Sequence, residues 1–143
     1  MAVNVGQRQV PDTASTAKCY AVDAALDLAE HTLKNCKNEK HFSPEYKEWI
    51  TDPLVMAARD AYALADEANG IRVTTRKDWQ DREELQLEAI KNASRMKPLI
   101  NLARRMNHLR RGKTEYWISK SNYALAMLKK WHTADRKRYK DIA

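Results

Sequence analysis

Lysine and arginine side chains gather in one stretch of the chain, residues 104–143. This stretch holds twelve basic and three acidic residues, whereas residues 1–103 hold fourteen basic and sixteen acidic ones. Cationic side chains with few acids among them bind polyanions, and arginine can pair with phosphate through two parallel hydrogen bonds. The sequence therefore predicts a nucleic-acid interface made of Arg104, Arg105, Arg110, Arg111, Lys113, Lys120, Lys129, Lys130, Arg136, Lys137 and Arg138.

Two alternative roles for this charge stay open. A basic stretch also suits contact with an acidic protein partner, and a charged helix face is often only a solvated surface. Nothing in the sequence matches a motif that reads bases, such as a helix-turn-helix or an aromatic sheet platform. If nucleic acid binds, we expect recognition of shape and backbone, with an affinity that falls strongly as salt rises.

Residues that could perform catalysis or bind a metal form no recognisable pattern. The histidines, His31, His41, His108 and His132, are scattered, and no Glu-x-x-His pair of the di-iron bundle type occurs. The sequence also lacks a phosphate-binding glycine loop, a His-Glu-x-x-His motif and a Cys-x-x-Cys motif. It therefore predicts a protein that is not an enzyme and that holds no metal or cofactor.

The composition favours helices within a single domain. The chain has 143 residues, of which 43% are hydrophobic, and it contains only three glycines and four prolines. A chain of this size can bury a core, and this one has few residues suited to hairpin turns. No apolar run reaches the roughly 18 residues of a membrane helix, and no signal peptide is visible. We expect a cytoplasmic protein that does not contact a membrane.

Hydrophobic periodicity and capping residues predict four helices after a flexible tail at residues 1–12. Ser43 followed by Pro44 is typical of a helix start, and Thr75 or Asp78 can begin the next helix. Apolar residues then recur at steps of three and four through each segment. The four-helix bundle should occupy residues 13–143, with helices at about 13–38, 44–69, 75–110 and 113–139.

Three residues should interrupt or bend these helices. Pro53 and Pro98 each remove a backbone donor within a helix, so each predicts a bend. Gly112 is expected to end the third helix.

The apolar faces indicate how the helices pack. In the fourth helix Trp117, Ala124, Leu128 and Trp131 form the expected inner stripe, with Tyr116 and Tyr123 beside it. Amphipathic helices with short connections favour an all-α, antiparallel, up-down-up-down four-helix bundle. Several helices carry broader apolar faces than a lone bundle needs, which favours a homo-oligomer.

Five short patterns run through the chain. They are Ala-Asn at Ala68 and Asn69, Arg-x-x-x-Gln-x-x-Ala-Ile at Arg82, Gln86, Ala89 and Ile90, Leu-Ile-x-Leu-Ala at Leu99 to Ala103, Lys-x-x-Tyr-Trp at Lys113, Tyr116 and Trp117, and Leu-x-x-Trp-x-x-x-Asp at Leu128, Trp131 and Asp135. With them, roughly residues 17–139 resemble a family of bacterial and phage four-helix-bundle proteins. This family includes the accessory variability determinant of diversity-generating retroelements, and its relatives are encoded in intervening sequences of 23S ribosomal RNA genes.

The resemblance implies a non-catalytic function. Proteins similar to the accessory variability determinant form barrel-shaped homopentamers with a basic surface. They bind the retroelement's reverse transcriptase and its structured template RNA, and they are required for error-prone copying opposite adenine. The resemblance thus implies a ring-shaped homo-oligomer, with reverse transcriptase and RNA or RNA/DNA as partners. The alternative is a four-helix-bundle protein-interaction module, such as a protein of a ribosomal RNA intervening sequence, without a nucleic-acid role.

Overall fold

The computed structural model of the chain describes residues 19–143, and these contain helices but no strand. The expected tail at residues 1–12 and the expected helix start at residue 13 lie outside the described residues. The elements are α1 (Tyr20–Cys36), the 3₁₀ turn η2 (Pro44–Tyr46), the π-helical turn η3 (Lys47–Thr51), α2 (Asp52–Asn69), α3 (Arg76–Ser94), α4 (Met96–Asn107) and α5 (Arg111–Arg138).

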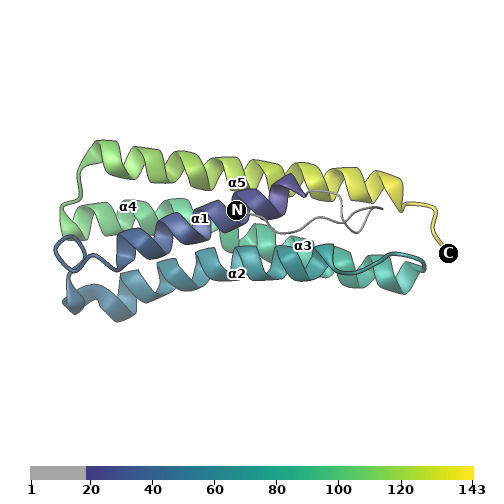
Figure 1. Cartoon of the computed structure of the whole chain (residues 1–143), viewed down its shortest axis with the longest axis horizontal. Helices are drawn as coiled ribbons and strands as arrows, with labels where there is room; N and C mark the ends of the chain where they lie inside the picture. Colours follow the sequence, from purple (N-terminus) through teal and green to yellow (C-terminus); the bar gives the residue numbers. More distant parts are fainter. Residues whose placement is uncertain (1–18) are drawn as a thin grey trace, which may run out of the picture.

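Within residues 19–143 these elements form four rods that lie side by side along the long axis (Figure 1). The first rod is α1, the second joins η2, η3 and α2, the third joins α3 and α4, and the fourth is α5. The connections at 37–43 and 108–110 lie at one end in Figure 1, whereas the loop at 70–75 lies at the other. The prediction of an all-helical four-helix bundle is confirmed.

The start of the second rod shows how a proline is accommodated. Ser43 caps the turn as expected, because its Oγ accepts a hydrogen bond from the Glu45 N–H at 3.2 Å. In the π-helical turn η3 the Asp52 N–H donates to the carbonyl of Lys47, five residues earlier. Pro53 follows directly and has no N–H to continue this pattern. The wide turn therefore lies where the proline removes a donor, and α2 continues regularly after it.

The third rod is broken at Arg95, so the expected helix at 75–110 is two helices. Its start agrees with one of the two predicted caps, since Thr75 Oγ1 accepts from the Asp78 N–H at 3.2 Å while the Asp78 carboxylate accepts from the Thr75 N–H. Pro98 explains the break, because a proline ring clashes with the carbonyl four residues earlier, here that of Ser94. That residue is the last of α3.

The turn between the third and fourth rods corrects the prediction for Gly112. α4 ends at Asn107, and His108 takes the left-handed conformation, with φ 55° and ψ 44°. Its successor Leu109 donates its N–H to the carbonyl of Arg104 at 3.0 Å, which closes the helix end. Gly112 lies inside the first turn of α5, where an added Cβ would meet no atom within 4 Å. The prediction is wrong because a residue other than glycine can take the left-handed cap at a modest cost.

The helix α2 ends at Asn69, as expected, and Gly70 follows it with φ −79° and ψ −11°, a right-handed conformation.

The core divides into two clusters along the rods, and the break at Arg95 lies at their boundary. One cluster contains larger side chains and draws on α4, with Leu28, Leu54, Met96, Ile100 and Trp117 among its members. The other draws on α3 and consists mostly of alanines, namely Ala21, Ala61, Ala65, Ala89 and Ala93, with Val22 and Leu128. Small side chains let helices approach closely, so the two halves differ in packing.

Candidate nucleic-acid interface

The structure spreads the eleven predicted basic residues over the end of α4, the adjoining connection and the length of α5. Arg104 and Arg105 lie in the last turn of α4, and Arg110, Arg111 and Lys113 lie in the adjoining connection and first turn of α5. The remaining six lie further along α5, which spans about 42 Å at 1.5 Å per residue. They are Lys120, Lys129, Lys130, Arg136, Lys137 and Arg138. The predicted residues therefore form an extended surface with a cluster at each end, not one compact patch.

This surface has few acids to neutralise it. Residues 96–138 hold twelve basic and two acidic residues, whereas residues 20–69 hold five basic and ten acidic ones. One of the two acids, Asp135, is buried. Within residues 19–143, only Arg111 among the predicted cations forms an ion pair, a long one of 3.8 Å with Glu115. The charges on α4 and α5 are thus largely free to meet a polyanion.

The edge of α5 that faces α1 combines cations with tyrosines. Tyr116 contacts His31 of α1 edge-on, with ring centroids 5.3 Å apart, and Lys120 Nζ lies 5.3 Å from the centre of the Tyr116 ring. Tyr116 and Tyr123 are 57% and 58% exposed, although the sequence suggested that they flank the inner stripe. The signal that could have revealed them is the seven-residue spacing they share with Lys113 and Lys120.

Positive charge also surrounds His31. Burial, followed by the nearby ammonium groups of Lys120, Lys113 and Lys34, lowers the pKa of His31 below its usual value. The buried Nε2 of His31 has no hydrogen-bond partner among the described residues. His31 therefore lies near lysines of both α1 and α5, and its surroundings favour the neutral imidazole.

The expected inner stripe of α5 is mostly buried. Trp117, Ala124 and Leu128 are at most 1% exposed, and the Trp117 Nε1–H donates to Thr32 Oγ1 at 3.0 Å. Trp131 is only partly buried, and the Arg82 guanidinium carbon lies 5.2 Å from its ring centre. These tryptophans have structural contacts inside the bundle.

A buried polar cluster joins three of the patterns found in the sequence. Arg82 Nε and Gln86 Nε2 each donate to Asp135 Oδ2 at 2.8 Å. The Arg82 side chain also donates to the carbonyls of Ala68 and Ile71, at 3.4 and 3.2 Å. Arg82, Gln86 and Asp135 are 8%, 1% and 2% exposed. These three side chains form a hydrogen-bonded link between α3, α5 and the end of α2.

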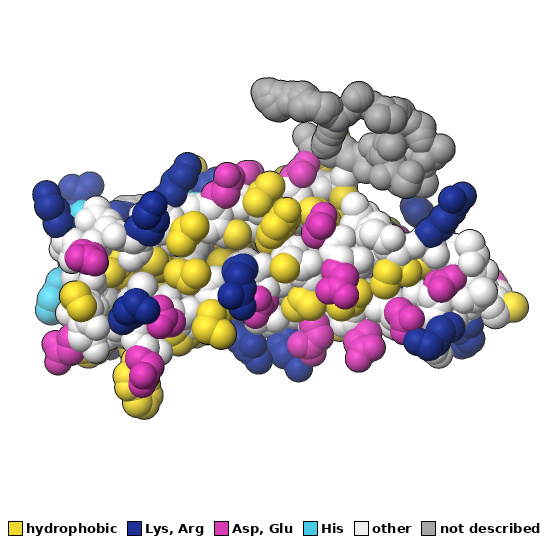
Figure 2. Space-filling view, turned by 60° about the horizontal axis from the view of Figure 1, so that its bottom comes forward, with side chains coloured by type: hydrophobic (Ala, Val, Ile, Leu, Met, Phe, Trp, Pro, Cys, Tyr) yellow, Lys and Arg dark blue, Asp and Glu magenta, His cyan; other side chains and the backbone are white. Residues whose placement is uncertain are grey.

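Two surface hollows accompany these features. One, of about 580 Å³, lies where α5 meets the start of α1, and its lining includes Tyr20, Lys130, Trp131 and Arg138. The other, of about 500 Å³, lies between α1 and the second rod and is mostly apolar; its lining includes Leu33, Cys36, Phe42, Val55 and Met56. In the view of Figure 2, hydrophobic side chains lie in a band along the molecule, with acidic side chains beside them.

The part of the chain that the structure describes contains no group of three or more His, Cys, Asp or Glu side chains placed to hold a metal ion. Among the same residues, no helix is both long enough and apolar enough to cross a bilayer. Comparison with known proteins adds no relative, since no family model and no curated protein matches this sequence.

Proposed function

We propose that this protein is a non-catalytic accessory protein that binds nucleic acid. The observation that carries the proposal is the side formed by α4 and α5, where only Arg111 of the predicted cations forms an ion pair within residues 19–143. Arginines and lysines spread over about 42 Å suit the repeating charge of a phosphate backbone. Each phosphate contact releases counterions, so the affinity should fall steeply with salt.

The resemblance to the accessory variability determinant supports a more specific setting. In this proposal the protein is bacterial or phage-encoded and cytoplasmic, and it belongs to a diversity-generating retroelement. It binds the reverse transcriptase together with template RNA or cDNA, and it supports mutagenic reverse transcription. The residues that carry the resemblance include Arg82, Gln86 and Asp135, which form a buried hydrogen-bonded cluster. Their shared contacts give these diffuse patterns a common structural basis.

The proposal includes an antiparallel, up-down-up-down course of the four rods and a ring-shaped homo-oligomer, a pentamer by resemblance. Connections at alternate ends of the molecule support the first part (Figure 1). Exposed apolar side chains support the second, since Leu33 and Met56 are 49% and 50% exposed beside the groove between α1 and the second rod. A ring would repeat the basic surface of each subunit and strengthen its field.

Binding to labelled RNA, measured by fluorescence anisotropy over a series of salt concentrations, tests the nucleic-acid function. We expect binding at ~50 mM salt that weakens linearly on a log–log plot. Reversing Arg104, Arg105, Arg110 and Arg111 to glutamate should abolish it. A control reverses Lys47, Arg59, Lys77 and Lys91, which are exposed and paired with acids on the second and third rods.

Both quadruple variants change the net charge equally, from +7 to −1. A loss confined to the first variant supports a located interface. Equal losses of RNA binding in both variants would show that net charge, and not a located interface, determines the affinity. No binding by the wild-type protein at ~50 mM salt would refute the nucleic-acid function. Co-purification with a reverse transcriptase encoded nearby tests the retroelement setting.

A protein-interaction module without a nucleic-acid role is the second candidate. The mostly apolar groove between α1 and the second rod favours it, because exposed apolar surface of this kind often marks a protein contact. The basic side would then meet an acidic protein. The genomic neighbourhood distinguishes these two functions. A nearby reverse-transcriptase gene with imperfect repeats favours the nucleic-acid-binding accessory protein, and a surrounding ribosomal RNA gene favours the protein-interaction module.

A further inference from the structure

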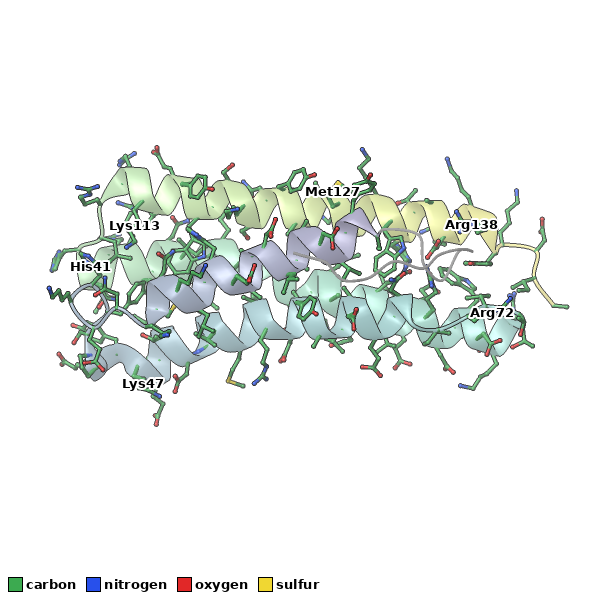
Figure 3. All side chains as sticks on the ribbon, viewed as in Figure 1. His41, Lys47, Arg72, Lys113, Met127 and Arg138 are labelled. Carbon is green, nitrogen blue, oxygen red and sulfur yellow. The ribbon has the colours of Figure 1, made fainter. Side chains whose placement is uncertain are left out.

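One edge of α5 carries lysines and tyrosines in alternation. Positions 113, 116, 120, 123, 127 and 130 follow one another at steps of three and four, which places them on one side of a helix. The residues are Lys113, Tyr116, Lys120, Tyr123, Met127 and Lys130. We call this row the Lys/Tyr stripe. Figure 3 labels Lys113 and Met127 on it and Arg138 beyond its end, so its course along α5 can be followed there.

Contacts with α1 fix the direction in which the stripe faces. Near its start, the ring of Tyr116 meets His31 of α1. Towards its other end, Met127 and Lys130 line the same hollow as Tyr20 of α1. The stripe therefore lies on the edge of α5 that faces α1, and it ends at the hollow beside Tyr20. Lys129, the neighbour of Lys130, points about 100° away around the helix and does not line that hollow.

The tyrosines present ring surface to solvent. Tyr116 and Tyr123 are both more than half exposed, and seven residues separate them, or about 10 Å along the helix. Tyr116 is not a core residue, since its neighbour Trp117, at 0% exposure, fills the core-facing position. Exposed aromatic rings next to cations are the combination with which proteins bind unpaired bases and their phosphates together.

The charge along this edge of α5 agrees with nucleic-acid binding. The stripe itself contains no acid. Burial lowers the pKa of His31 most, and Lys120 and Lys113 from α5, with Lys34 from α1, lower it further. The α1 helix contributes Asp27, one turn before His31, which would disfavour a phosphate at that point.

We propose that the Lys/Tyr stripe on the α1-facing edge of α5 binds single-stranded nucleic acid, with unpaired bases stacked on Tyr116 and Tyr123 and phosphates held by Lys113, Lys120 and Lys130. The proposal rests on the proposed nucleic-acid function and adds the form of the ligand. A duplex keeps its bases stacked inside and offers mainly phosphates, so tyrosines would add little to its binding. A single strand can present base faces to the rings while its backbone follows the lysines.

The test compares a single-stranded oligouridine of about 15 nucleotides with an RNA duplex of equal length, a span that fits known single-strand sites. Both are measured with the full chain at ~50 mM salt by fluorescence anisotropy. Tyr116→Ala and Tyr123→Ala should each raise the Kd for the single strand roughly fivefold or more, and change the Kd for the duplex little. Tyr116→Phe and Tyr123→Phe keep the stacking surface and should stay close to wild type.

Two controls separate the stripe from the rest of the surface. Trp49→Ala removes an aromatic ring that is 77% exposed on η3, away from the stripe, and should leave binding unchanged. Lys120→Ala should weaken single-strand binding more than Lys129→Ala, although both remove one lysine from α5. Circular dichroism verifies that each variant is folded.

The outcomes distinguish failure of the stripe from failure of the proposed function. If the wild-type protein binds neither ligand, both proposals fall. If it binds duplex as tightly as single strand and the alanine variants behave like wild type, the nucleic-acid function stands and the stripe proposal is overturned. Equal losses in the alanine and phenylalanine variants would also overturn it, because the hydroxyl groups would then matter and not the rings.

Discussion

Arg82 and Asp135 lie 53 residues apart in the sequence, yet Arg82 Nε donates to Asp135 Oδ2 at 2.8 Å in the interior of the bundle. Their side chains are 10% and 3% exposed. Gln86 donates to the same carboxylate oxygen, and two backbone carbonyls accept from the arginine. The pair thus joins the start of α3 to the end of α5, and α2 is tied in through Ala68.

Removing the acid of this pair should be costly. Asp135→Ala leaves the Arg82 guanidinium buried without its charge partner, and we expect a loss of about 3–5 kcal/mol in the free energy of unfolding. Chemical denaturation followed by circular dichroism measures it. Glu115→Ala breaks the exposed 3.8 Å pair with Arg111 and serves as the control, with an expected change under about 1 kcal/mol.

Replacing both partners of the buried pair sharpens that comparison. Arg82→Met with Asp135→Leu removes both charges at once, so the double variant should be less destabilised than Asp135→Ala. A double variant as unstable as Asp135→Ala would show that the unpaired charge of Arg82 is not what destabilises the single variant.

The bond between Trp117 and Thr32 should couple α5 to α1. Trp117→Phe removes the donor and leaves the buried Thr32 hydroxyl unsatisfied, which should lower the free energy of unfolding by about 1–3 kcal/mol. Thr32→Val removes the acceptor. A double-mutant cycle should give a coupling energy of about 1 kcal/mol, and strictly additive effects would show that the hydrogen bond contributes nothing to stability.

The pH dependence of His31 follows from its surroundings. Burial and the charges of Lys120, Lys113 and Lys34 lower its pKa, so folding favours the neutral ring. The unfolded chain takes up the proton first, below about pH 6.5. The stability contributed by this residue is therefore complete above that pH and is lost as pH falls through the pKa of the folded state.

Proton NMR of the imidazole ring should show this directly. We expect a titration midpoint for His31 below 6.5. Lys120→Met should move the midpoint upward, because it removes the largest charge contribution. Lys129→Met serves as the matched control and should not move it. An unchanged midpoint in the Lys120→Met variant would mean that this lysine does not affect the pKa of His31.

The left-handed residue before α5 offers a gain in stability. His108 has a φ of 55°, which costs an L-residue about 1–2 kcal/mol relative to glycine. His108→Gly should raise the free energy of unfolding by about 1 kcal/mol, whereas His108→Val should lower it by at least as much. His41→Gly is the control, since His41 is exposed and has no positive φ, and it should bring no gain.

Patterns local to the chain located much of the fold. Ser43 and Thr75 cap helices in the way their sequence positions indicate, and Pro98 marks the break in the third rod. The position of the left-handed residue was not predictable in the same way. Any residue can adopt that conformation at a cost, so the presence of Gly112 nearby was a misleading signal.

The candidate site was predictable in its charge but not in its arrangement. Counting lysines and arginines finds α4 and α5, because composition alone carries that information. Whether Tyr116 or its neighbour Trp117 faces the core depends on where α1 lies around α5, and adjacent residues differ by only about 100°. The contact between Arg82 and Asp135 likewise depends on how two rods pack against each other, which the hydrophobic periodicity of either helix does not predict.

The break at Arg95 also bears on how the folded chain opens. It separates a cluster with large side chains from one built mostly of alanine, and all four rods contribute to both. Alanines bury less apolar surface than leucine, isoleucine or tryptophan, so the alanine half is held by a smaller hydrophobic contribution. Amide protons of α3 should therefore exchange with solvent through a partial opening, whereas those of α4 and the first half of α5 should exchange only through global unfolding.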